Sequence, residues 1–211
     1  MGPVTIEFFH DVICSFCFPM SYRMRQLQAA MPQVRILHRS YALVWDNGDP
    51  ARAADDPVPS RAELLTHWAR ASRLDDLDRF NLSGMAGADF PFPSSVLPLL
   101  ACQAGRRTAG EAGYWDMFDA LQHALFVQCL NIGDTQVVER CARRTHLDFG
   151  QWQRHYRDPA TRAQVEEDFR LVSRYGVRQV PTLVVDGVHL LEDGAIPLPR
   201  LMAQIAALAS R

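Results

Sequence analysis

Two cysteines separated by two residues stand where the pattern of the chain changes from strand to helix. The segment "VTIEFFHDV" is rich in β-branched and aromatic residues, as a buried strand is. Cys14 and Cys17 follow at once, "SYRMRQLQAAMP" continues as a helix, and "VRILHRSYALV" has the composition of a second strand. This order predicts an α/β fold with the cysteines at the strand-to-helix junction, where open α/β sheets usually place their chemistry.

The middle of the chain is helical, and strand patterns return near its end. A polar loop, "DNGDPARAADDPVPS", precedes a series of segments with helical spacing that ends at Gly176. The expected helix N-caps are Ser94 or Ser95, Asp134, and Asp158 with Pro159 first in its helix. After Gly176, "VPTLVVDGVHLLED" contains two short strands joined by a two-residue turn at Asp186-Gly187, and "LPRLMAQIAALAS" is an amphipathic helix. We therefore predict an α/β domain of residues 1–57 and 166–211, with an all-helical insertion of residues 58–165.

Length, composition and charge exclude several kinds of partner. The chain has 211 residues, of which 48% are hydrophobic and 22% charged, as in an ordinary globular protein. Its formal net charge is −2 and it has no large basic patch, so neither nucleic acid nor an anionic membrane surface is expected as a partner. No apolar run approaches the ~20 residues that span a bilayer. The N-terminal segment has no export signal, so a cytoplasmic location is expected if Met1 is the native start.

Five cysteines are spread over the chain: Cys14, Cys17, Cys102, Cys129 and Cys141. An odd, thinly spread number is not typical of a secreted disulfide scaffold. In a reducing cytosol a close pair is more often catalytic or metal-binding than structural. The last three lie in helical patterns, and we expect them to be buried and to form no disulfide with the first pair.

The chemistry of the pair follows from its place at a helix N-terminus. A cysteine there faces unpaired backbone N–H groups and the positive end of the helix dipole, which favour the thiolate. We therefore expect Cys14 to be the exposed thiolate and Cys17, one turn further on, to be more buried. From that place Cys17 can reach back to Cys14 and resolve a mixed disulfide.

Two other interpretations of the pair stay open at this point. A structural zinc site normally needs four ligands. His10 would be a third ligand beside the two cysteines, but no fourth is evident, and no metal is expected. Alternatively, both cysteines are inert residues of the core.

Taken together, "IEFFHDVICSFC", the helical block and "GVRQVPTLVVDG" resemble the DsbA-like branch of the thioredoxin superfamily, most of all its FrnE-type cytoplasmic oxidoreductases. The resemblance covers nearly the whole chain. The segment "MFDALQHALFVQCLNIGDTQVVERCARRTHLD" is similar to the family's insertion, and "VPTLVV" to its cis-proline strand. It implies a thioredoxin fold and a thiol–disulfide oxidoreductase that acts on protein or small-molecule thiols and disulfides.

The resemblance also implies roles for single residues. Cys14 would be the nucleophile and Cys17 the resolving cysteine. Pro181 would be the cis proline beside them, and Val180 would offer backbone hydrogen bonds to an extended substrate segment. Glu7 would match a buried acid that serves related proteins as a proton shuttle; otherwise it would point to solvent at a strand edge.

One departure from the family leaves the direction of the reaction open. The family often has Pro-Trp between the two cysteines, whereas this chain has Ser15-Phe16. These residues influence the reduction potential, so oxidation, reduction and isomerisation of disulfides all remain open. The physiological substrate, the oligomeric state and the role of the other three cysteines also remain open.

Two hypotheses from other functional classes compete with the thiol–disulfide oxidoreductase. Kappa-class glutathione transferases and 2-hydroxychromene-2-carboxylate isomerases resemble the chain in architecture and bind glutathione beside the cis proline. They carry serine at the position of Cys14 and lack the paired thiols, so the pair favours redox chemistry. The other alternative is a module that binds a partner peptide without chemistry. No cofactor is expected, and glutathione is a candidate co-substrate.

Overall fold

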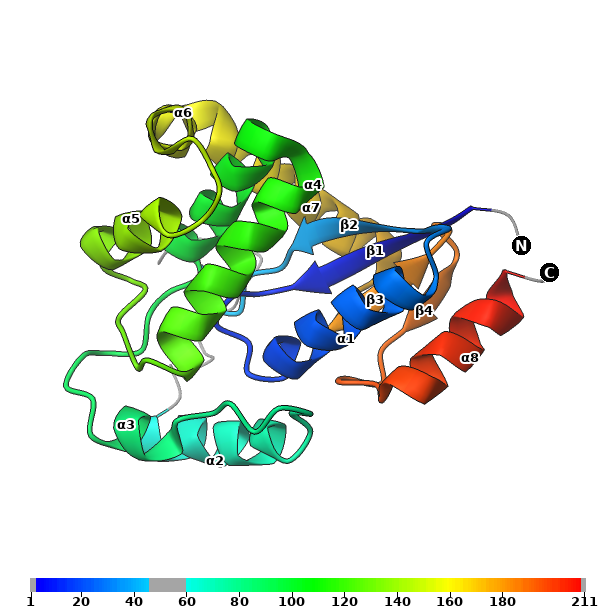
Figure 1. Ribbon diagram of the computed structural model, residues 1–211, viewed down its shortest axis with the longest axis horizontal. Helices are drawn as coiled ribbons and strands as arrows, with labels where there is room; N and C mark the ends of the chain where they lie inside the picture. The colour runs from blue at the N-terminus through cyan, green and yellow to red at the C-terminus, as the bar shows by residue number, and fades with distance from the viewer. Residues whose placement is uncertain (1–2, 46–59, 210–211) are drawn as a thin grey trace.

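The computed structural model describes residues 3–45 and 60–209 (Figure 1). Its strands are β1 (Val4–His10), β2 (Val34–Ser40), β3 (Thr182–Val185) and β4 (His189–Leu191). Its helices are α1 (Cys17–Ala30), α2 (Arg61–Ser72), α3 (Leu82–Ala86), α4 (Val96–Phe126), α5 (Thr135–Arg143), α6 (Phe149–Arg157), α7 (Pro159–Tyr175) and α8 (Leu198–Leu208). The predicted order, β-α-β, helices, β-β-α, is confirmed, although β2 is shorter than the predicted second strand.

The four strands form one mixed sheet in the order β2-β1-β3-β4. β1 and β2 are parallel, while β3 runs antiparallel to β1 and β4 antiparallel to β3. Figure 1 shows α1 and α8 over one face of the sheet and α7 over the other. The α/β fold with a helical insertion between β2 and β3 is thus confirmed.

Only one of the two expected domain limits lies within the described residues. The polar loop, up to residue 59, and the limit between residues 57 and 58 lie outside the described residues. Helix α7 (Pro159–Tyr175) runs through the second limit, between residues 165 and 166. The division into two domains therefore stays a prediction.

Local signals set several element boundaries as expected. The side chains of Asp134 and Asp158 accept N–H groups of α5 and α7, and Gly176 ends α7 with a φ of 68°. The hairpin turn also lies at Asp186 and Gly187, with φ of 51° and 71°. However, Val185 pairs with His189, so the loop contains three residues instead of two.

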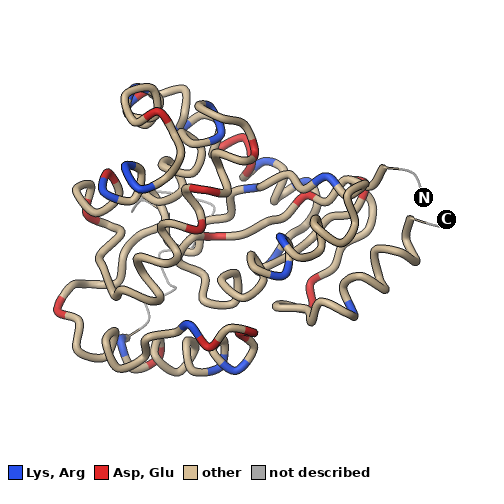
Figure 2. Tube along the Cα trace, viewed as in Figure 1, with Lys and Arg blue, Asp and Glu red and all other residues tan. Residues whose placement is uncertain are grey.

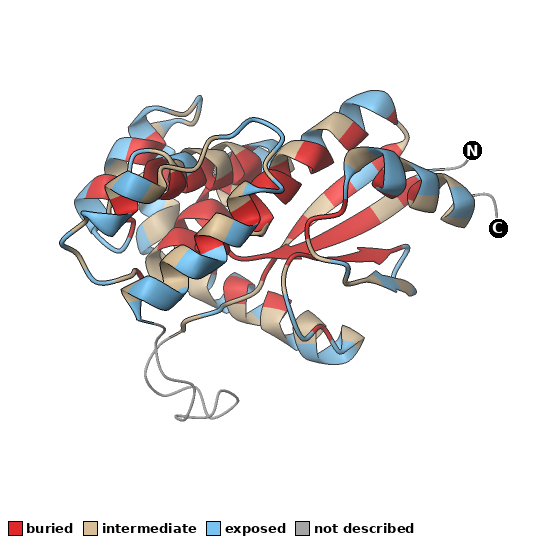
Figure 3. Cartoon of the chain, turned by 90° about the horizontal axis from the view of Figure 1, so that it is seen from below, coloured by how far each residue is buried: buried red, intermediate tan, exposed pale blue. Residues whose placement is uncertain are grey.

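The side chains of β1 alternate between two separate packing regions. Ile6 and Phe8 are fully buried in the main core with Met20, Met24 and Leu27 of α1. Phe9 belongs to a second cluster with Val177 and Val184, against Tyr175 of α7. Figure 3 shows the buried residues concentrated along the sheet and the inner sides of the helices, while Figure 2 shows acidic and basic residues interspersed over the molecule.

Helix α4 contains a bend that folds its two halves against each other. The bend lies at Ala109 and Gly110, where φ of 66° and ψ of −155° favour glycine. On either side, Gly105 and Gly113 approach so closely that a Cβ atom on Gly113 would lie 2.3 Å from the carbonyl oxygen of Gly105. Glycine is therefore required at this crossing.

Candidate active site

The loop that carries the cysteines is a tight connection between β1 and α1. The N–H of Cys14 donates to the carbonyl of Asp11 (3.2 Å), and the N–H of Cys17 donates to the carbonyl of Cys14 (3.1 Å). Helix α1 begins at Cys17, and the preceding Phe16 provides no side-chain cap. The first turn also contains no acidic residue. The positive end of this helix is therefore left open to a negatively charged sulfur.

Cys14 lies against the segment before β3, as predicted. Its Sγ atom is 3.5 Å from the carbonyl oxygen of Val180, which accepts the thiol hydrogen. The Val180–Pro181 peptide bond is cis, which confirms that prediction. The expectation that Cys14 is exposed is wrong, because the Val180 segment lies against its sulfur and leaves only 4% of the residue accessible.

Cys17 is completely buried, as expected of a resolving cysteine. Burial, together with the hydrogen bond and charge of Cys14, raises the pKa of Cys17 well above its usual value. Both cysteines are free thiols. The pair thus contains a deeper thiol that is difficult to ionise and a shallower thiol at the helix terminus.

The other three cysteines are also free thiols, as predicted. Cys102 and Cys141 are buried within helices, and burial raises the pKa of Cys141 to about 11. The expectation of a buried, helical position is wrong for Cys129, which is only partly buried and lies beyond the end of α4 at Phe126, with a positive φ of 53°. Burial raises its pKa as well, so all three are poor nucleophiles near neutral pH.

Glu7 has well-defined partners on the α7 side of the sheet. Its carboxylate accepts hydrogen bonds from the Nε of Arg39 at 2.6 Å and from the hydroxyl of Tyr175 at 2.7 Å. The residue is 7% exposed, so the alternative of a solvent-facing strand edge is wrong. Its hydrogen bond with Tyr175 raises the pKa of that phenol. A proton-shuttle role for Glu7 stays a prediction.

Sequence reasoning missed Asp11 beside the motif, and it considered His10 only as a third zinc ligand. His10 is fully buried, and its Nε2 lies 3.0 Å from Nδ1 of His38. Asp11 is also fully buried and accepts hydrogen bonds from two backbone N–H groups and a serine. The available signal was an acidic residue directly after a buried strand. Among the described residues, no group of three or more His, Cys, Asp or Glu could hold a metal ion.

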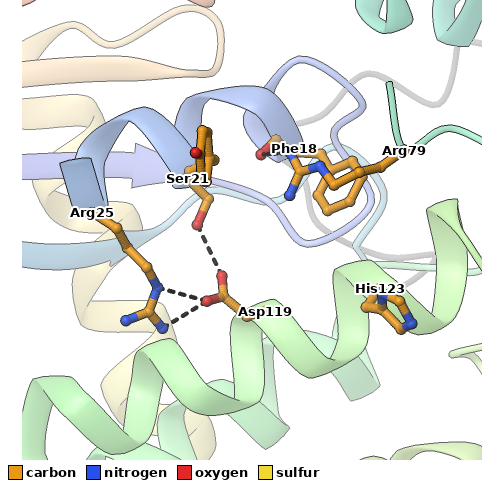
Figure 4. A pocket seen from close by; sticks show the side chains of 7 residues that line it. Phe18, Ser21, Arg25, Arg79, Asp119 and His123 are labelled. Carbon is orange, nitrogen blue, oxygen red and sulfur yellow. Dashed lines mark hydrogen bonds and ion pairs between the residues drawn. The ribbon is translucent and has the colours of Figure 1, made fainter. Parts of the chain in front are cut away.

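A pocket of about 190 Å³ lies between α1 and α4, beginning one residue after Cys17, at Phe18. Figure 4 shows Ser21 and Arg25 pointing from α1 toward Asp119 of α4. Arg79, on the other side of the pocket, forms an ion pair with Asp75. Because both arginines are already paired with carboxylates, the pocket offers little net attraction for an anion.

None of the helices in the described part of the chain is both long and apolar enough to span a membrane.

A family model described as a DSBA-like thioredoxin domain matches residues 5–206. A curated relative, the ClpXP adapter protein SpxH of Halalkalibacterium halodurans, is 22% identical over 195 residues. This match covers 91% of the chain but only 61% of the length of the relative.

Two solved structures from different functional classes have the same fold. The cytosolic disulfide reductase DsbM from Pseudomonas aeruginosa with GSH has a TM-score of 0.76 at 16% identity, covering 98% of this chain and 100% of that one. A 2-hydroxychromene-2-carboxylate isomerase has a TM-score of 0.68 at 16% identity, covering 97% and 96%. At these identities the two structures show a shared fold.

Proposed function

Since the chain belongs to the family of DsbA-like thioredoxin domains, we propose that it is a thiol–disulfide oxidoreductase acting through Cys14 and Cys17. One observation carries the proposal. The two thiols stand at the uncapped start of α1, one of them fully buried and the other against the Val180 carbonyl.

The two cysteines take different parts in the exchange. Cys14 attacks a substrate disulfide, forms a mixed disulfide and releases one substrate sulfur as a thiolate. Cys17 then loses its proton and attacks the Sγ of Cys14. This step forms the Cys14–Cys17 disulfide and releases the second substrate sulfur, so that the substrate is reduced and the pair is oxidised. The same steps in reverse oxidise a substrate dithiol.

The segment before β3 is the proposed substrate-binding strand. Pro181 is buried beside the motif, and the Val180 carbonyl already accepts a hydrogen bond from Cys14. An extended substrate segment would replace this thiol and bond to the backbone of Val180. We also propose that Glu7 is a proton shuttle.

The proposed setting is a FrnE-type enzyme of the cytoplasm with protein or small-molecule thiols as partners. The DsbM structure, which is described as cytosolic and contains GSH, supports both the location and glutathione as a co-substrate. The direction of the reaction in the cell is left open by the Ser15-Phe16 dipeptide.

Two other functions have specific support. The fold shared with 2-hydroxychromene-2-carboxylate isomerase favours a glutathione-dependent isomerase or transferase as the alternative. The relative described as a ClpXP adapter favours a module that binds a partner without chemistry. Neither alternative needs two thiols, so the cysteine pair distinguishes the redox function from both.

The test is thiol–disulfide exchange with oxidised glutathione, measured with two variants. We expect Cys14→Ser to abolish exchange, because a serine is not ionised at neutral pH. We expect Cys17→Ser to accumulate a mixed disulfide that a reductant dissolves. Cys129→Ser, which changes a partly exposed thiol outside the motif, is the control and should leave exchange unchanged.

Exchange that persists in Cys14→Ser would refute the redox mechanism. Isomerase or transferase activity in that variant would support the first alternative. The second alternative would be supported if the wild type showed no exchange and Cys14→Ser bound a partner with the same affinity as the wild type.

A further inference from the structure

Asp11 is a buried carboxylate that joins three segments of the chain at the cysteine loop. Its Oδ1 accepts the N–H of Ile13 at 3.3 Å, within the loop itself. Its Oδ2 accepts the N–H of Leu43, beyond the end of β2, and the hydroxyl of Ser95, each at 2.6 Å. Ser95 directly precedes α4, so the carboxylate connects the loop to the insertion.

The surroundings of Asp11 fit the ionised form of the carboxylate. Each of these three partners is a donor, and an ionised carboxylate only accepts hydrogen bonds. The Ser95 hydroxyl also accepts the N–H of Val44 at 3.0 Å, while its own hydrogen is directed to Asp11. Ser94 or Ser95 was expected to cap α4; Ser95 is at the N-cap position, but its side chain makes no cap bond. The Ser95 hydroxyl donates its hydrogen bond to the buried Asp11 carboxylate instead.

Asp11 influences Cys17 in two opposite ways. Burial is the largest cause of the raised pKa of Cys17, followed by the hydrogen bond and the charge of Cys14. The backbone N–H of Asp11 donates to the sulfur and lowers that pKa, and the negative charge of the carboxylate, the smallest of these influences, raises it. Asp11 therefore affects the second thiol of the pair through both its backbone and its carboxylate.

We propose that Asp11 is a positioning residue that holds the cysteine loop against the start of α4 and, as a fixed negative charge, slows the attack of Cys17 on the mixed disulfide. The inference rests on the proposed function. Because the carboxylate already accepts three hydrogen bonds, it acts as a charge and not as the acceptor of the Cys17 proton. A slow second step gives another thiol time to attack the mixed disulfide, which favours isomerisation and exchange with small thiols.

The affected step involves definite bonds. Cys17 loses its proton, and its thiolate attacks the Sγ of Cys14. The Cys14–Cys17 bond forms, the bond between Cys14 and the substrate sulfur breaks, and that sulfur leaves as a thiolate and takes up a proton. Only the thiolate of Cys17 attacks, so a nearby negative charge lowers the rate by lowering the thiolate fraction.

The test compares Asp11→Asn with the wild type in reaction with excess oxidised glutathione. Acid quenching and mass spectrometry separate the formation of the mixed disulfide from its resolution. Loss of the charge should raise the thiolate fraction of Cys17 on the order of tenfold. Since nucleophilicity falls with basicity by a Brønsted slope of about 0.5, resolution should be about threefold faster. The first step should change less.

Ser95→Ala is the matched control, because it removes one hydrogen bond and keeps the charge. We expect its resolution rate to stay near that of the wild type. An unchanged or slower second step in Asp11→Asn, or an equal acceleration in Ser95→Ala, would overturn the role of the charge.

Two further outcomes are distinguishable. If the wild type forms no mixed disulfide, the proposed function fails. If it does and only the Asp11 effect is missing, this inference alone fails. Asp11→Ser provides a second neutral variant; if neither variant folds, the carboxylate is a requirement of folding and the redox role is rejected.

Discussion

Helix α1, which begins at Cys17, starts differently from α5 and α6 of the insertion. α5 and α6 begin after Asp134 and Asp148, whose carboxylates each accept a backbone N–H at 2.8 Å. α1 begins after Phe16, which caps nothing. The positive end of the helix is thus neutralised by a carboxylate in α5 and α6 and left available to the cysteines in α1. α4 also begins without a side-chain cap, but no cysteine stands at its start.

The same two regions differ in what they bury. The strands β1 and β2 and the cysteine loop bury ionisable groups: Glu7, His10, Asp11, Cys17 and His38. The neighbouring insertion packs aromatic rings, among which Trp68 and Phe126 have centroids 4.7 Å apart. We infer that pH acts on stability mainly through the first region, while the second depends on close packing.

The largest expected effect is a loss of folding stability at acidic pH. Burial holds the pKa of His10 and of His38 well below the usual value of 6.5. Below pH 6.5 the unfolded chain therefore binds protons that the folded protein does not, and stability falls as the pH falls. Above pH 6.5 both states are neutral and the contribution is constant. For two histidines the loss reaches up to about 4 kcal/mol between pH 6.5 and pH 5.

Urea unfolding over this pH range measures the loss. His38→Gln removes one of the two groups, and we expect it to reduce the slope of stability against pH by up to half. His146→Gln, which changes an exposed histidine, is the control. The raised pKa values of Asp119 and Asp168 act in the opposite sense, but they are present in every variant and cancel. An unchanged slope in His38→Gln would contradict the comparison.

The next effect concerns the packing of the insertion. Gly113→Ala places a Cβ atom 2.3 Å from the carbonyl oxygen of Gly105, where backbone atoms have to move apart. We expect the free energy of unfolding to fall by about 3 kcal/mol, at the upper end for overpacking. Gly87→Ala is the matched control, since its new Cβ would have only ordinary contacts at 3.8 Å. Equal stability of both variants would show that the two halves of α4 separate readily.

Local signals made much of this fold predictable. The β1 composition, the cysteine pair, the Asp158-Pro159 start and the Asp186-Gly187 turn each depend on a few adjacent residues, so the sequence could predict them. The position of Pro181 beside the motif came from a family resemblance. The covering of Cys14 could not be predicted, because Val180 is separated from it by 166 positions in the chain.

The polar partners of the site were unpredictable for the same reason. Ser95 was identified as a helix start from its neighbours, but its hydroxyl binds Asp11, which lies 84 positions away. Likewise, Glu7 binds Tyr175 of α7, 168 positions away. Which buried acid meets which donor is decided by tertiary packing, and a single sequence contains no local sign of it.

The smallest effect tests the comparison of helix starts directly. Phe16→Asp gives α1 the acidic cap that α5 and α6 have. The carboxylate would neutralise the positive end of the helix and repel a thiolate at Cys14, so exchange with oxidised glutathione at neutral pH should slow on the order of tenfold. The rate should recover as the pH is raised, because a larger thiolate fraction then forms despite the repulsion. Phe16→Asn adds a neutral cap of the same shape and loses the same aromatic ring, so it should retain most of the rate. If the two variants slow equally, the ring of Phe16 and not the open helix terminus supports reactivity, and the contrast between α1 and the capped helices has no bearing on the chemistry.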